Sequence, residues 1–184
     1  MNPAGGPFDS NPFGILAVPG GRIVTDAGDN SLLRIAANGD ISTIAVFPSR
    51  PSRSTDAVPT AVEIGPDGAY YVSELSGVPF APGAARIYRV EPGSPPEVYL
   101  TGFTTAIDLA FGPDTSLYVL QHSTLFPFFG GPGSLVRVAP DGSRSTVLAG
   151  LDRPTSVAVG PDGAIYVTNH GVSRGIGEVL RIEP

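Results

Sequence analysis

Four oxygen-bearing side chains recur at a nearly constant spacing in this chain. Asp26, Glu74, Gln121 and Asn169 follow one another at intervals of 47 or 48 residues, each at the end of a short apolar run. Carboxylate and amide oxygens are the ligands that Ca²⁺ prefers in proteins. If a repeat fold brings the four positions to one rim, they form a candidate calcium site. The alternative is that each side chain caps its own strand end by binding backbone groups.

Two histidines directly follow two of these positions, in Gln121-His122 and Asn169-His170. Imidazoles at matched positions of neighbouring repeats can act as an acid/base pair or share a ligand. We therefore include His122 and His170 among the candidate ligand-binding residues. The alternative is two loop histidines on a polar rim, because the sequence identifies no third ligand or orienting partner.

Asp108 interrupts an apolar run, Ala106 to Phe111, that should form an innermost strand. The other repeats have Gly14, Ala61 and Ser156 at the equivalent position. A carboxylate at this place should face a central channel, because an apolar packing surface does not accept an isolated charge. It is then either a metal ligand or catalytic group, or a side chain solvated by water in the channel.

A loop between two predicted strands carries a cluster of large apolar side chains. Its members are Leu125, Phe126, Phe128 and Phe129, and Phe80 lies in the corresponding loop of the preceding repeat. Loops on one face of a rigid scaffold commonly carry binding sites. An aromatic patch there could bind an apolar ligand or a protein partner. The alternative is that the cluster folds over the scaffold or fills a gap beside it.

The elements that must position these residues repeat with the same period. Turns around Pro19, Pro66, Pro113 and Pro161 each separate two strand-sized runs rich in Val, Ile, Leu, Tyr and Thr. Each unit has four such runs, and the last unit stops after its third. A period of this length built from strands predicts a β-propeller.

We therefore predict an all-β chain that forms a partial β-propeller of about four blades. Each blade is a four-stranded antiparallel sheet, and the last lacks its fourth strand. The expected division is an irregular segment over 1–10 and a single domain over 11–184, with blades at about 11–48, 58–102, 104–150 and 153–184. An arginine recurs in strand three, as Arg34, Arg89, Arg137 and Arg181, and should pack its stem and pair with a carboxylate.

The amino-acid composition argues against several classes of function. The 184 residues carry a net charge of −6, which disfavours nucleic acid as a partner. The absence of cysteine removes disulfide and thiolate chemistry. No apolar run is long enough for a membrane span, and the first residues, Met1 to Pro7, lack the charged and apolar regions of a signal peptide. The compartment is therefore unknown from the sequence.

Several segments together resemble the ScyD/ScyE family. They are NPFG at 11–14, DAGDNSLLR at 26–34, DAVPT at 56–60, GPDGAYYV at 65–72 and GIGEVLRI at 175–182. The resemblance implies a six-bladed propeller similar to NHL-repeat and gluconolactonase-like proteins, of which the latter hold a metal near the axis. Family members typically have an export signal and further blades upstream, so the resemblance implies a secreted protein if such a segment precedes this one.

The missing fourth strand of the last unit predicts a ring that does not close, with three explanations: a fragment of a longer propeller, self-association through open blade edges, or an unusual four-bladed ring. We expect a non-enzymatic propeller that binds a small apolar molecule or a protein partner through one loop face. The alternative is a metal-dependent hydrolase or lactonase, with Ca²⁺ as the candidate cofactor. A non-functional fragment is the third possibility.

Overall fold

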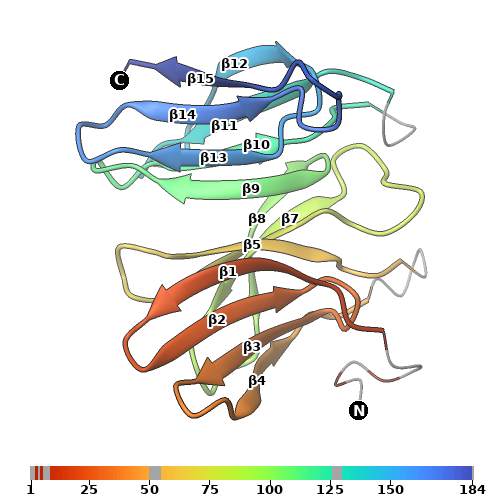
Figure 1. Cartoon of the computed structure of the whole chain (residues 1–184), viewed down its shortest axis with the longest axis vertical. Coiled ribbons are helices and arrows are strands. Elements are labelled where there is room, and N and C mark those ends of the chain that lie inside the picture. Colours follow the sequence, from red (N-terminus) through yellow and green to blue (C-terminus); the bar gives the residue numbers. More distant parts are fainter. Residues whose placement is uncertain (1–2, 4, 6–8, 50–54, 126–129, 184) are drawn as a thin grey trace.

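The computed structural model describes residues 3, 5, 9–49, 55–125 and 130–183. Phe126, Phe128 and Phe129 of the predicted apolar cluster lie outside these residues. Where the chain is described it forms strands joined by turns and loops, which confirms the all-β prediction (Figure 1). This part of the chain contains no helical segment with the length and apolarity that crossing a membrane requires.

The strands form four antiparallel sheets, each built from consecutive strands. Blade 1 contains β1 (Pro12–Val18), β2 (Gly21–Asp26), β3 (Ser31–Ala36) and β4 (Ile41–Val46). Blade 2 contains β5 (Pro59–Ile64), β6 (Tyr70–Glu74), β7 (Ala85–Val90) and β8 (Glu97–Phe103). Blade 3 contains β9 (Ala106–Phe111), β10 (Leu117–Gln121), β11 (Gly133–Val138) and β12 (Arg144–Leu151). Blade 4 contains β13 (Ser156–Val159), β14 (Ile165–Asn169) and β15 (Glu178–Ile182), and is three-stranded as predicted.

The first strands of the blades, β1, β5, β9 and β13, contact one another in that order and form the inner side of the molecule (Figure 1). The loops that join strands two and three lie at the right of this view, and we call that side the loop face. The Pro-Asp-Gly turns lie at the opposite side, the turn face. This is the propeller arrangement that the repeat predicts.

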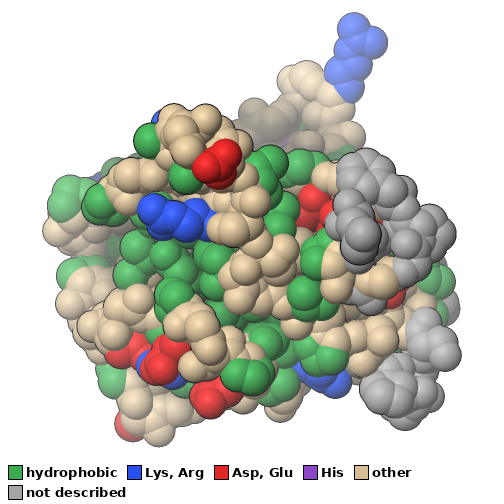
Figure 2. Space-filling view, turned by 90° about the horizontal axis from the view of Figure 1, so that it is seen from below, with side chains coloured by type: hydrophobic (Ala, Val, Ile, Leu, Met, Phe, Trp, Pro, Cys, Tyr) green, Lys and Arg blue, Asp and Glu red, His purple; other side chains and the backbone are tan. Residues whose placement is uncertain are grey.

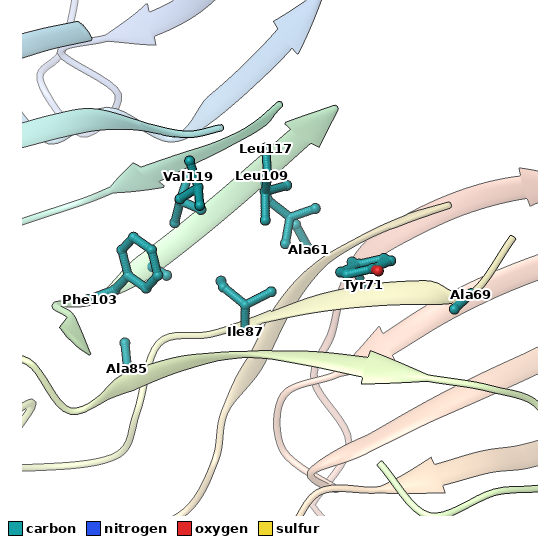
Figure 3. Packing of buried hydrophobic residues seen from close by; sticks show 11 residues of the cluster. Ala61, Ala69, Tyr71, Ala85, Ile87, Phe103, Leu109, Leu117 and Val119 are labelled. Atoms are coloured by element: carbon teal, nitrogen blue, oxygen red, sulfur yellow. The ribbon is translucent and has the colours of Figure 1, made fainter. Parts of the chain in front are cut away.

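The core lies between successive blades, because side chains on a strand alternate between the two faces of its sheet. Figure 3 shows this packing between blades 2 and 3, where Tyr71 and Ile87 meet Leu109, Leu117 and Val119. Two similar clusters join blade 1 to blade 2 and blade 3 to blade 4.

An aspartate of the turn face pairs with the recurring arginine in three of the blades. Arg89 Nε lies 2.6 Å from Asp67 Oδ2, and Arg137 Nη2 lies 2.7 Å from Asp114 Oδ2. In blade 4 the atoms Arg181 Nη2 and Asp162 Oδ2 are 3.2 Å apart. The turn of blade 1 has glycine in place of the aspartate, and there Arg34 Nη2 lies 3.5 Å from a backbone carbonyl. The arginines therefore serve the repeat by fixing each turn to strand three.

The outward face of blade 1 is apolar and exposed. Figure 2, which views this end of the molecule, shows hydrophobic side chains gathered across it. Phe13, Ile15 and Ile41 each expose more than half of their surface. An exposed apolar face of this kind can bind a partner, and self-association at an end blade stays a prediction.

Candidate functional site

The four repeat-equivalent oxygen-bearing side chains each lie buried at the end of strand two. Asp26 Oδ1 accepts hydrogen bonds from the backbone N–H groups of Asn11, Gly28 and Asp29, at 2.7–3.1 Å. Asp26 Oδ2 accepts one from Ser10 Oγ at 2.6 Å. Burial alone would raise the pKa of Asp26, but these donors outweigh it and lower the pKa.

The equivalent residues of the other blades bind in a similar way. Gln121 Oε1 accepts the Thr104 N–H at 2.6 Å, and Asn169 Oδ1 accepts the Asp152 N–H at 2.8 Å. The buried carboxyl group of Glu74 lies near the hydroxyl of Tyr88 in the same blade and, besides burial, contributes to the raised pKa of Tyr88.

All four side chains thus bind within their own blades, and in three of them the partner is the backbone that leads into strand one. In the described part of the chain, no three His, Asp or Glu side chains group as a metal ion needs. The contacts correspond to the capping alternative considered from the sequence, while metal binding at these positions stays untested.

The two histidines occupy different surroundings although their sequence positions match. His122 is buried, and its Nδ1 lies 2.9 Å from the carbonyl oxygen of Pro154 in the next blade. Burial lowers the pKa of His122, because the imidazolium loses hydration. His170 is more exposed, with Nδ1 2.9 Å from Asp152 Oδ2 and Nε2 3.6 Å from Glu178 Oε1. The two imidazoles therefore have separate partners.

Two described members of the predicted apolar loop set lie on the loop face. Leu125 exposes 54% of its surface. Phe80 is half-buried in the loop that follows β6. Because the remaining phenylalanines of the set lie outside the described residues, the site stays a prediction.

A polar hollow of about 370 Å³ lies on the inner side, lined by the first strands of all four blades. Asp108 lines it, as the sequence predicted for a carboxylate facing the channel. Glu63 from β5 lines it as well, although we did not predict it. The signal was present in the sequence, because the repeats place Leu16, Ala110 and Ala158 where blade 2 has Glu63.

Asp108 joins the inner strands of blades 3 and 4. Its Oδ2 accepts hydrogen bonds from Ser156 Oγ at 2.7 Å and from the Val157 N–H at 2.9 Å. Its Oδ1 accepts the Leu109 N–H at 2.9 Å. Burial raises the pKa of Asp108 despite these three donors. Burial and, secondarily, the charge of Asp108 raise the pKa of Glu63. The two acids therefore hold protons more tightly than ordinary carboxyl groups do.

Blade 3 also breaks a hydroxyl pattern at this place. In the other three blades a side-chain hydroxyl on strand two accepts a hydrogen bond from a backbone N–H on strand one, at 2.8–3.0 Å. The N–H donors and their hydroxyl acceptors are Gly14 with Thr25, Ala61 with Ser73, and Ser156 with Thr168. Blade 3 has Leu120 in place of the hydroxyl and Asp108 on the neighbouring strand. The repeat is thus altered at two paired positions beside the hollow. A departure from an internal repeat at its axis favours a local role over a general structural one.

Comparison with known proteins gave structural matches but no sequence match. No family model and no curated protein matched the chain. It is similar to a gluconolactonase from Xanthomonas campestris, with a TM-score of 0.62, 18% identity, and coverage of 89% of this chain and 55% of that one. It is also similar to virginiamycin B lyase from Staphylococcus aureus, with a TM-score of 0.63, 18% identity, and coverage of 93% and 55%.

A third similar structure is the PQQ-bound aldose sugar dehydrogenase from Streptomyces coelicolor, with a TM-score of 0.66, 17% identity, and coverage of 98% and 62%. The chain spans less than two thirds of the length of these three chains. At such identities the likeness shows the fold alone. The chain therefore has the β-propeller fold that these three proteins share, and its described part forms four blades.

Proposed function

We propose that this chain is a ligand-binding propeller of the ScyD/ScyE type, and that its polar axial hollow binds a small hydroxyl-bearing molecule of the sugar class. The carrying observation is the pair Glu63 and Asp108, which lines a hollow shared by all four inner strands. Two of the structurally similar proteins are named for sugar or sugar-lactone substrates. This supports the ligand class.

The chemistry of the hollow suits hydrogen bonding to several hydroxyl groups. Carboxyl oxygens accept hydrogen bonds from hydroxyl groups, and a protonated carboxyl group also donates one. Burial raises the pKa of both Glu63 and Asp108, so each takes up a proton more readily than an exposed carboxylate does. The lining also includes Thr155 and Ser156, whose hydroxyls can do the same. A polyhydroxylated ligand has the complementary set of groups.

Saturation-transfer NMR with D-glucose tests the proposal. We expect the signal of wild-type protein to fall about tenfold or more in the variant Glu63→Gln with Asp108→Asn, because a buried polar group that loses its hydrogen-bond partner costs about 1–3 kcal/mol. The matched control is Asp141→Asn, which changes a carboxylate of an exposed turn. Absence of binding to the wild type, or equal binding by both variants, would refute the proposal.

A metal-dependent lactonase is the second candidate, favoured by the presence of two acids at the axis. The described residues do not fit a resident metal there, because donors already bind both oxygens of Asp108 and no third acid or imidazole joins the pair. We therefore derive no step through a metal. Hydrolysis of D-glucono-1,5-lactone above the spontaneous rate, dependent on Ca²⁺ and abolished by chelator, would favour this candidate over simple binding.

The third candidate function is binding of an apolar molecule or a protein partner at the loop face. The supporting observation is the exposure of Leu125 on a loop of blade 3. Replacing Leu125 by Ser should then weaken binding of an apolar probe such as anilinonaphthalene sulfonate. Unchanged probe binding would count against this face.

A further inference from the structure

The junction between blades 2 and 3 is filled by aromatic rings near the turn face. Tyr71 of β6 packs edge-on against Tyr99 of β8, with centroids 5.0 Å apart and an interplanar angle of 83°. It also packs edge-on against Phe111 of β9, at 5.0 Å and 80°. Edge-to-face pairs at this separation are favourable beyond the apolar area that they bury.

The junction between blades 3 and 4 has the same central tyrosine but smaller neighbours. Tyr118 pairs with Arg137 across its sheet, as Tyr71 pairs with Arg89, so the two tyrosines are equivalent. Val147 lies at the register shift between β11 and β12, where Tyr99 lies in blade 2. Val159 ends β13 as Phe111 ends β9. Both rings that enclose Tyr71 are thus replaced by valine around Tyr118.

A hollow of about 420 Å³ lies beside Tyr118 and Val147, and we call it the blade 3–4 pocket. Pro113, Gly163 and Ile165 complete its apolar wall. The turn prolines and glycines place it on the turn face, whereas the axial hollow is lined by the inner strands. It is therefore a site separate from the one proposed above.

We propose that the blade 3–4 pocket binds a small aromatic molecule, whose ring lies against Tyr118 where the preceding junction has its own aromatic rings. The charged groups that line the pocket are Asp114, Arg137 and Glu183. Glu183 pairs with Arg181, which also pairs with Asp162, so three acids face two arginines around the pocket. Arg137 is paired with Asp114. An aromatic ammonium is therefore preferred over an aromatic carboxylate of the same size.

Titration calorimetry of the full chain with 2-naphthylmethylamine tests this, with 2-naphthoate as the probe of opposite charge. Val147→Tyr should lower the amine affinity by about tenfold or more, because the new ring occupies the volume that the ligand needs. The variant should remain folded, since blade 2 carries Tyr99 at the equivalent position with 47% of its surface exposed. Circular dichroism checks the fold, and the substitution leaves the net charge unchanged.

The reverse substitution, Tyr99→Val, gives an independent readout. It removes one of the two rings that enclose Tyr71, while Phe111 stays in place. It should therefore open space beside Tyr71 and add a second site for the amine, seen as a doubled stoichiometry. The proposal is supported if Val147→Tyr removes binding and Tyr99→Val adds a site. It is overturned if the wild type does not bind the amine, or if folded Val147→Tyr protein binds it as the wild type does.

Discussion

The hydroxyl of Thr60 links the inner strands of blades 2 and 3, and its removal is the sharpest test of how the blades are joined. Thr60 Oγ1 donates to the Ala106 carbonyl at 2.9 Å and lies 2.8 Å from Ser73 Oγ. The residue is 1% exposed. Thr60→Val keeps the shape of the side chain and removes these polar interactions together with a longer hydrogen bond to the Ser73 carbonyl at 3.2 Å.

The expected destabilisation comes from buried polar groups that lose a hydrogen-bond partner. The carbonyl of Ala106 is left without this donor and Ser73 Oγ without this partner, both inside the protein. An unsatisfied buried polar group costs about 1–3 kcal/mol. We therefore expect the free energy of unfolding to fall by about 2 kcal/mol, which for a domain of this size lowers the melting temperature by about 4–8 °C.

Urea unfolding followed by circular dichroism measures this change, with the slope of the free energy against urea as a check that the same surface is exposed. The matched control is Thr168→Val, whose hydroxyl binds Ser156 and Thr155 within blade 4, at a more exposed position. The control should be destabilised about half as much or less, because water can reach the groups left unpaired. Equal destabilisation in the two variants, or a change below about 0.5 kcal/mol for Thr60→Val, would refute the reasoning.

Three further predictions follow from other contacts. Burial raises the pKa of Glu63 and Asp108, so the folded state binds these protons more tightly than the unfolded chain does. The wild type should therefore gain stability relative to the Glu63→Gln, Asp108→Asn variant as pH falls from neutrality towards the ordinary values of 4.5 and 3.8, and a constant difference would contradict this. The pKa of Asp114, held at about 2 chiefly by Arg137, implies a stabilisation that is present above pH 3.8 and lost as pH falls through about 2. Because the Asp114 side chain is half-exposed, solvent screens its ion pair, and we expect Asp114→Asn to lower the free energy of unfolding by only about 1 kcal/mol at neutral pH. At the acid end of the titration the substitution should have no effect, and urea unfolding measures both. Finally, a Cβ on Gly14 would collide with the carbonyl of Thr60, so Gly14→Ala should destabilise by about 2 kcal/mol or more in thermal melts, whereas Gly177→Ala, which meets open space, should not.

The repeat made much of the fold predictable. Strand-sized runs and turn residues are local features, and the inter-blade core follows from their alternation once the blades are stacked. The arginine pairs were also foreseeable, because Asp67 and Arg89 lie within one sheet and recur in later units. Asp108 could be identified from its departure from the other repeats. The same comparison would have found Glu63, where blade 1 has Leu16.

The sequence by itself determined the number of blades, their strand order and the position of one axial acid, because these depend on neighbours along the chain. Only the tertiary structure decided which groups meet. Asp26, Gln121 and Asn169 share a repeat position but bind backbone within their own blades. Asp108 instead reaches Ser156 in the next blade. Equivalent positions in a repeat share their local surroundings, whereas convergence depends on how the blades are inclined to one another, which the spacing of residues does not encode.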